Sequence, residues 1–125
     1  MYRKLPGSHD EVLGYEISGQ VSEDEFHEIA TEVQEAIDEF GDARVLTRMV
    51  EVPGPEYLRS FGERLRFVRD EAGGLERYAV VSDDPQPEWI EWLADRVTPI
   101  EVRHFGQDDE PDAWQWVSAR SAPAI

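Results

Sequence analysis

Apolar residues recur along this chain with two different periods, and each period indicates one kind of element. Alternation of apolar and polar residues, or a short continuous apolar run, predicts a β-strand, whereas apolar residues three and four apart predict a helix. The predicted strands cover residues 3–5, 11–17, 43–50, 78–81 and 100–105. The predicted helices run from Ser22 to Gly41, over about 56–69, from Pro85 to Val97, and from Asp108 to Val117.

The helix that begins at Ser22 has the strongest local signals. Ser22 and Glu25 form a capping-box pattern, in which each side chain bonds a free backbone amide at the helix start. Apolar residues then follow at helical spacing, and Gly41 ends the series: Phe26, Ile29, Ala30, Val33, Ile37 and Phe40. In the preceding strand, Gly14 indicates either a bulge or the close approach of another group.

The order of the elements, ββαβαβαβα, predicts the topology. A single helix between two strands implies parallel strands joined by a right-handed crossover, whereas the turn at residues 6–10 joins the first two strands as an antiparallel hairpin. We therefore predict an α/β fold with a mixed, mostly parallel five-stranded sheet packed with four helices. One domain covers residues 1–120, and residues 121–125 form a short C-terminal tail.

Four stretches combine core and turn residues in a particular order. They are residues 5–8 (LPGS) with 12–14 (VLG) and 18–19 (SG), 75–83 (LERYAVVSD), 89–93 (WIEWL), and 100–105 (IEVRHF) with 113–117 (AWQWV). In these stretches the chain resembles the stage II sporulation protein AA-like family, a branch of the STAS (sulfate transporter and anti-sigma-factor antagonist) fold. The resemblance covers nearly the whole chain and implies a STAS-like domain. Its motifs are mostly structural, so they indicate the fold more than the chemistry.

The resemblance also implies where a regulatory switch would lie. In the anti-sigma-factor antagonists proper, a partner kinase phosphorylates a serine at the start of the helix after the third strand. Residues 51–56 of this chain contain no hydroxyl group at that place, and Ser60 lies at least one turn into the predicted helix. We therefore do not expect the phosphorylation switch here. For the AA-like branch the resemblance implies a hydrophobic cleft and membrane association.

The charge excludes several classes of function. The chain has 28 acidic and 12 basic residues, a formal charge of -16, which repels nucleic acids and anionic lipids. Only Lys4 among the basic residues is a lysine, and the acids are dispersed, as in proteins adapted to a high-salt cytoplasm. No apolar run approaches the length of a membrane span, and Met1 is followed by no apolar signal segment, so we expect a cytoplasmic protein.

Few residues suggest catalysis or metal binding. The chain has no cysteine, and His9, His27 and His104 have no metal-site spacing, so we predict no metal, cofactor or catalytic residue. The series Ser8, His9, Asp10 is better explained as a polar turn than as a catalytic triad. Asp83 and Asp84 follow the carboxyl end of a predicted strand, which is where α/β sheets bind ligands, so an enzyme that uses either residue is one alternative. Capping of the next predicted helix explains the same two residues.

Large aromatic residues are more numerous than the predicted helix faces can bury, and they give the most information about function. The last 37 residues hold four tryptophans, Trp89, Trp92, Trp114 and Trp116, more than one narrow helical stripe buries. They either pack against neighbouring helices or line a cleft between the second and third predicted helices. We assign that cleft to Tyr57, Phe61, Trp89 and Trp92.

These observations predict a non-enzymatic binding module. Its partner at the aromatic cleft is a nonpolar small molecule or lipid, or a protein partner, including a second copy in a homodimer, and not a nucleic acid. The alternatives are a membrane-surface-associated regulatory protein, against which the charge counts, and the enzyme using Asp83 or Asp84.

Overall fold

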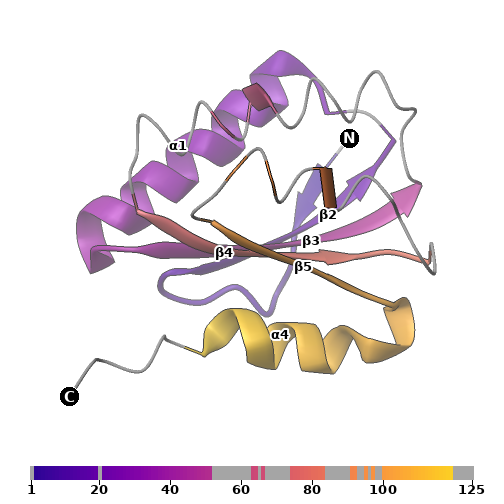
Figure 1. The fold of residues 1–125 in the computed structure, drawn as a ribbon. Coiled ribbons are helices and arrows are strands. Elements are labelled where there is room, and N and C mark those ends of the chain that lie inside the picture. The colour runs from indigo at the N-terminus through magenta and orange to yellow at the C-terminus, as the bar shows by residue number, and fades with distance from the viewer. Residues whose placement is uncertain are drawn as a thin grey trace.

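A computed structural model describes residues 2–19, 21–51, 74–83 and 100–119, together with residues 63, 64, 66, 91, 92, 95 and 97. The strands lie side by side in their chain order, from β1 to β5 (Figure 1). Their bounds are β1 Tyr2–Lys4, β2 Val12–Ser18, β3 Ala43–Glu51, β4 Leu75–Val81 and β5 Glu101–Phe105. The helices are α1 Glu23–Phe40 and α4 Glu110–Ser118, and a short 3-10 turn, η1 Gln107–Asp109, precedes α4.

The sheet has the mixed topology that the sequence predicted. Strand β1 pairs with β2 in antiparallel orientation, and the pairs β2–β3, β3–β4 and β4–β5 are parallel. Of the four predicted helices, α1 and α4 are the two that lie within the continuously described ranges. The segments predicted for the other two, 56–69 and 85–97, and the predicted tail at 121–125, fall mainly or wholly outside the described residues.

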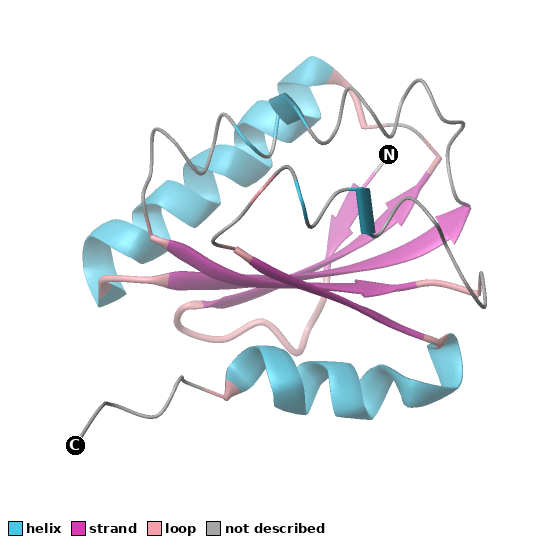
Figure 2. Cartoon of the chain, viewed as in Figure 1, coloured by secondary structure: helices cyan, strands magenta, loops and turns pink. Residues whose placement is uncertain are grey.

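Helix α1 covers one face of the sheet and α4 covers the other, as Figure 2 shows. Alternate strand residues therefore contribute to two separate cores. The α1-side core contains Leu13, Tyr15, Val33, Ala36, Ala43, Val45, Met49, Leu75, Tyr78, Val80, Val97 and Ile100. The α4-side core contains Leu5, Val12, Leu46, Ala79, Val81, Phe105, Ala113 and Val117.

Both ends of α1 follow the sequence signals. The Ser22 hydroxyl accepts a hydrogen bond from the Glu25 amide, and the Glu25 carboxylate accepts one from the Ser22 amide, each at 3.1 Å. Gly41 adopts a left-handed conformation with φ of 88°, and its amide bonds the Ile37 carbonyl. The predicted capping box and glycine stop are both confirmed.

Helix α4 is attached to the sheet along its whole length. At its first residue, Glu110 accepts two hydrogen bonds from Arg48 of β3, both 2.6 Å long. In the middle, Trp114 lies against Gly14 so closely that an added Cβ would be 2.3 Å from the indole ring, which confirms the predicted close approach. Near its end, the guanidinium of Arg77 donates to the Trp116 carbonyl at 2.7 Å, which complements the negative helix end.

Several predicted boundaries differ from the structure by one to three residues. Strand β4 begins at Leu75, three residues before the predicted start. The prediction began at the apolar run, but the charged residue Arg77 also pairs in register with Arg44 of β3. Strand β1 begins at Tyr2. Asp108 and Asp109 lie in η1, and α4 itself starts at Glu110 without a side-chain cap.

Candidate functional site

The apolar stripe of α1 is only partly buried. Of the six apolar residues predicted to face the core, Val33 is buried, at 3% exposure. The other five are half-buried: Phe26, Ile29, Ala30, Ile37 and Phe40. Ala36 of the same helix is also buried, and Phe26, Ile29, Ile37 and Phe40 pack against the α1-side core, so the stripe faces the sheet while part of its surface remains exposed.

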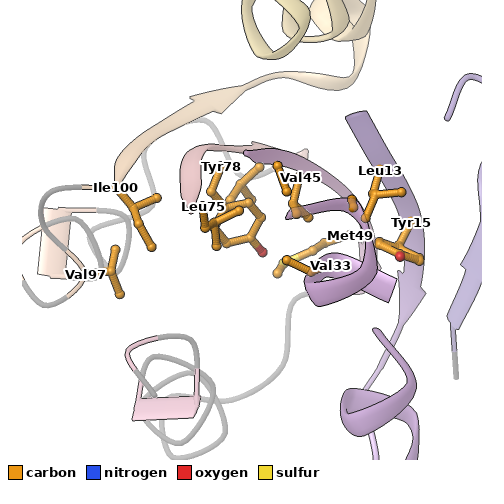
Figure 3. Close-up of a cluster of buried hydrophobic side chains, with 12 residues drawn as sticks. Leu13, Tyr15, Val33, Val45, Met49, Leu75, Tyr78, Val97 and Ile100 are labelled. Carbon is orange, nitrogen blue, oxygen red and sulfur yellow. The ribbon is translucent and has the colours of Figure 1, made fainter. Parts of the chain in front are cut away.

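A small cavity of about 40 Å³ lies beneath this helix. Its walls come from α1, β2, β3 and β4, with one residue from the turn before α1: Ile17, Val21, Phe26, Ile29, Ala30, Val33, Val45, Thr47, Leu75 and Tyr78. Figure 3 shows several of these side chains, among them Val33, Val45, Leu75 and Tyr78, converging within the α1-side core. The cavity exceeds the ~10–15 Å³ that a water needs and is well below the ~150 Å³ of a benzene-binding cavity.

Two of the cavity-lining residues are polar, and they bond each other. The hydroxyl oxygens of Thr47 and Tyr78 are 2.8 Å apart, and both side chains are buried. They come from the neighbouring strands β3 and β4, which pair in parallel. The remaining lining residues are hydrocarbon, and because the two hydroxyls bond each other, the surface that faces the cavity is wholly apolar.

The aromatic cleft predicted from the sequence is only partly within the described residues. Tyr57, Phe61 and Trp89 lie outside them. Trp92 is half-buried and packs against the α1-side core, the same core that surrounds the cavity. The cavity itself was not predicted, because its lining is gathered from separate elements and no local pattern marks it.

One residue of the predicted second helix lies beside α1. The guanidinium carbon of Arg64 is 5.6 Å from the centre of the Phe26 ring, and its Nη2 is 3.6 Å from Glu23 Oε1. Because Phe26 also lines the cavity, this contact brings residue 64 close to the cavity end of α1.

Two tyrosines attach the acidic side of α1 to the first hairpin. Tyr2 donates to Glu28 at 2.6 Å, and that bond together with burial raises the pKa of Tyr2 to about 12. Tyr15 donates to Glu32 at 3.3 Å, and burial is the main cause that raises its pKa. Both hydroxyls therefore remain protonated hydrogen-bond donors at neutral pH.

A larger, polar hollow lies at the carboxyl ends of β4 and β5. It encloses about 760 Å³, and Asp83, one of the two acids of the enzyme alternative, lines it; Asp84 lies outside the described residues. Ser82 and His104 also line it, with Ser82 Oγ 2.8 Å from His104 Nε2. Ser82 is fully buried, so its hydroxyl joins the two strand ends and is not accessible to a substrate.

The remaining candidate residues form a turn. Ser8 Oγ accepts a bond from the Gly14 amide at 2.9 Å and donates to the Gly14 carbonyl, while His9 Nδ1 lies 3.0 Å from the Gly7 carbonyl. The polar turn is confirmed, and Ser8 and His9 do not bond each other. Within the part of the chain that the structure describes, no three His, Asp or Glu side chains are grouped to hold a metal ion.

Comparison with known proteins identifies the family. The SpoIIAA-like family profile matches residues 12–118, from the start of β2 to the end of α4. Comparisons with curated proteins and with solved structures found no match. No helix in the described ranges is long and apolar enough to cross a membrane. Since the matched region spans most of the 125 residues and has the predicted mixed α/β sheet, the chain belongs to the SpoIIAA-like family.

Proposed function

We propose that this chain is a non-enzymatic binding module that accommodates a nonpolar ligand on the α1 side of its sheet. The observation that carries the proposal is the apolar cavity beneath α1. Membership of the SpoIIAA-like family supports a regulatory or binding role. The half-buried stripe of α1 lies on the same face, so part of its apolar surface is available to a ligand there.

The cavity gives an energetic reason for binding. An unfilled apolar volume of about 40 Å³ costs on the order of 1 kcal/mol of stability, and apolar atoms that fill it recover this amount. A ligand of more than a few heavy atoms displaces α1 outward, which costs little where the contacts of α1 are incomplete. We propose that Trp92, with Tyr57, Phe61 and Trp89, borders the enlarged site.

Methyl NMR in the presence of xenon tests this function. Xenon is a single apolar atom, and we expect it to shift the methyl signals of Val33, Val45 and Leu75. Methyl groups of Leu46 and Val117 in the α4-side core are the internal control and should not move. Equal or absent shifts in both cores of the folded protein would contradict the proposal.

A pair of matched substitutions tests the same cavity by stability. Val33→Ile adds one methylene beside the cavity, and we expect it to stabilise the fold by up to about 0.8 kcal/mol and to weaken xenon binding. Val117→Ile adds the same group to the α4-side core and should destabilise by about 1–3 kcal/mol through overpacking. Urea unfolding measures the free energy of unfolding of both variants. Equal losses of stability would show that the space beneath α1 cannot take the added methylene.

Trp92 tests whether the site extends to the predicted cleft. If it does, Trp92→Ala weakens the binding of a hydrophobic dye and leaves the fold intact. If Trp92 serves only as core, the substitution instead costs about 3–5 kcal/mol with no separate effect on binding. Dye titration and thermal unfolding of the same preparations separate the two results.

A protein partner is the second candidate occupant of this face. The family membership and the partly exposed apolar stripe of α1 favour a protein partner, because a helix of the partner can bury the exposed part of that stripe. Native mass spectrometry of freshly purified protein distinguishes the occupants. A small added mass supports a bound ligand, whereas a protein complex lost on substitution of Ile29 by Glu supports a partner.

A further inference from the structure

We infer that the outer edge of β5 pairs with the same edge of a second copy of this chain, which joins the two sheets into one. Among the strands that the structure describes, β5 is the last, and β4 is its one neighbour (Figure 1). A strand at a sheet edge can pair with a strand of another molecule through the backbone groups that its own sheet leaves unpaired. The described lining of the cavity beneath α1 includes no β5 residue, so the inference does not depend on the proposed function.

The outward backbone groups of β5 belong to Val102 and His104. The Phe105 carbonyl accepts a hydrogen bond from the Ser82 amide at 3.1 Å, so the backbone groups of Phe105 point toward β4. Because this direction alternates along a strand, the amides and carbonyls of Val102 and His104 point away from β4. Strand β5 contains no proline, and its register with β4 has no bulge, so two common devices that block an edge are missing from it.

The charged residues of β5 favour a second copy as the partner, and they select the register. Glu101 and Arg103 are exposed and lie on the same face of the sheet. When two copies pair in antiparallel orientation about Val102, Glu101 of each copy lies directly opposite Arg103 of the other. Pairing about Arg103 would place two arginines opposite each other, which is unfavourable. The edge is therefore complementary to itself, as a two-fold dimer requires.

Glu101 is available for this contact. Its carboxylate lies 3.7 Å from the Nε of Arg77, yet 61% of its side chain is exposed, so it can contact a second cation. The antiparallel arrangement also keeps the most acidic parts of the two copies apart. The polar hollow at the carboxyl end of β5 is lined by four carboxylates, and the two hollows lie at opposite ends of the paired strands. The formal charge of -16 on each copy still opposes association, and salt weakens that repulsion.

Two single charge reversals test the inference. Glu101→Arg and Arg103→Glu each place like charges opposite each other at both contacts, and sedimentation equilibrium should show self-association weakened at least about fivefold. An equal mixture of the two variants restores opposite charges at both contacts, so it should associate at least as well as wild type. Because the mixture contains the same two chains, its recovery also shows that both variants are folded. Glu39→Arg changes the net charge equally at an exposed position on α1 and, as control, should not weaken self-association.

Val102→Pro tests the backbone contact. It removes an outward amide and no hydrogen bond to β4, a position where an edge strand tolerates proline, so self-association should weaken while thermal unfolding changes little. Wild type is measured from about 0.1 M to about 1 M KCl, and its self-association should strengthen as salt rises. A wild type that stays monomeric at about 1 mM protein in all of these salts overturns the inference. A dimer that neither charge reversal nor Val102→Pro weakens, or a mixture that does not recover, overturns it as well.

Discussion

Gly14 leaves the space on β2 that an indole ring of α4 occupies. With no Cβ at residue 14, the ring of Trp114 lies directly against the strand backbone, and Gly7 also contacts it. The Trp114 Nε1 donates to Glu110, which Arg48 already holds. One glycine therefore sets the distance between α4 and the sheet.

Gly14→Ala should reduce the free energy of unfolding by about 1–3 kcal/mol, because the new Cβ would lie 2.3 Å from the Trp114 ring and the ring must move. Urea unfolding measures the loss. Gly106→Ala is the matched control, since its nearest contact would be an ordinary 3.8 Å, and it should have little effect. A smaller ring, in Trp114→Phe, should reduce the cost of Gly14→Ala; additive losses would contradict the close contact.

Arg44 is the most buried charged residue that the structure describes. Its side chain is 1% exposed and lies within 3.4 Å of carboxylate oxygens of Glu11, Asp42 and Glu76. A buried guanidinium is tolerated only when such partners compensate for its lost hydration. The three acids come from separate elements, so Arg44 joins the amino ends of β3 and β4 to the turn before β2.

Arg44→Met should destabilise the protein by about 3–5 kcal/mol, because it leaves three carboxylates near one another without their cation. Chemical unfolding at neutral pH measures the change. Arg3→Met also removes an ion pair, but the Arg3 side chain is 68% exposed, so a loss below about 1 kcal/mol is expected. Similar losses in the two variants would show that burial does not strengthen the Arg44 cluster.

At the scale of elements, the two helices are held in different ways. Helix α4 is hydrogen-bonded to the sheet at its start and end, through Arg48 and Arg77, and packs closely against Gly14 at its middle. Helix α1 is held by the caps at its two ends, by hydrogen bonds from tyrosine hydroxyls and by its apolar stripe, most of which is half-buried. The firmly held helix and the loosely held helix lie on opposite faces of one sheet (Figure 2).

The contact between Arg48 and Glu110 should make stability depend on pH. The hydrogen bond from Arg48 lowers the pKa of Glu110, and Arg48 likewise lowers the pKa of Glu16. A carboxyl with a lowered pKa contributes stability above its ordinary value of 4.5, and the contribution is lost as the pH falls through the folded-state pKa. Acid should therefore loosen α4 from β3.

Glu110→Gln should cost about 1–3 kcal/mol at pH 7 and progressively less as the pH falls below 4.5, because the charge-assisted bonds contribute less to stability there. Urea unfolding at pH 7, 5, 4 and 3 compares the variant with wild type. Asp112→Asn, an exposed carboxyl on the same helix, serves as control and should show no such difference. A constant cost of Glu110→Gln at every pH would refute the role of its charge.

Most elements of the fold could be predicted because their signals are local. Alternating apolar residues marked the strands, and Ser22 and Gly41 fixed the ends of α1. The start of β4 was missed because Arg77 places a charge on a buried strand, where the Trp116 carbonyl and ring compensate for it. Only the folded structure brings that compensation together.

The site was predicted less well than the fold. The aromatic side chains predicted a cleft between the second and third predicted helices; of its four residues Trp92 is described, and it packs against the α1-side core. The cavity depends on small side chains, such as Ala30 and Val45, that fail to fill a space between elements. Such a space is a property of tertiary packing, and it has no period or motif in the sequence.

At the scale of the whole molecule, the acidic residues outnumber their possible partners. With 28 acids and 12 bases, the carboxylates exceed the cations by 16. Among the described residues, seven basic side chains lie in ion pairs: Arg3, Lys4, Arg44, Arg48, Arg64, Arg66 and Arg77. The remaining negative charge therefore opposes the compact state by self-repulsion.

The melting temperature should rise steeply as KCl increases from dilute buffer to about 1 M, because the Debye length shortens from about 10 Å at 0.1 M to about 3 Å at 1 M. Differential scanning calorimetry measures the rise. NaCl should act like KCl if screening is the cause. A melting temperature that does not change with salt would refute the adaptation to high salt inferred from the charge of -16.

The chain order of the strands has a consequence for synthesis on the ribosome. Each of β2 to β5 pairs with the strand made just before it, so the sheet can grow as the chain emerges. Helix α1 is made before β3, whereas α4 is made after all five strands. Until residue 118 has left the ribosome, Leu46, Ala79 and Val81 face water on an uncovered side of the sheet. A chain that stops before α4 should therefore aggregate, and the repulsion between its carboxylates is the main force that opposes this.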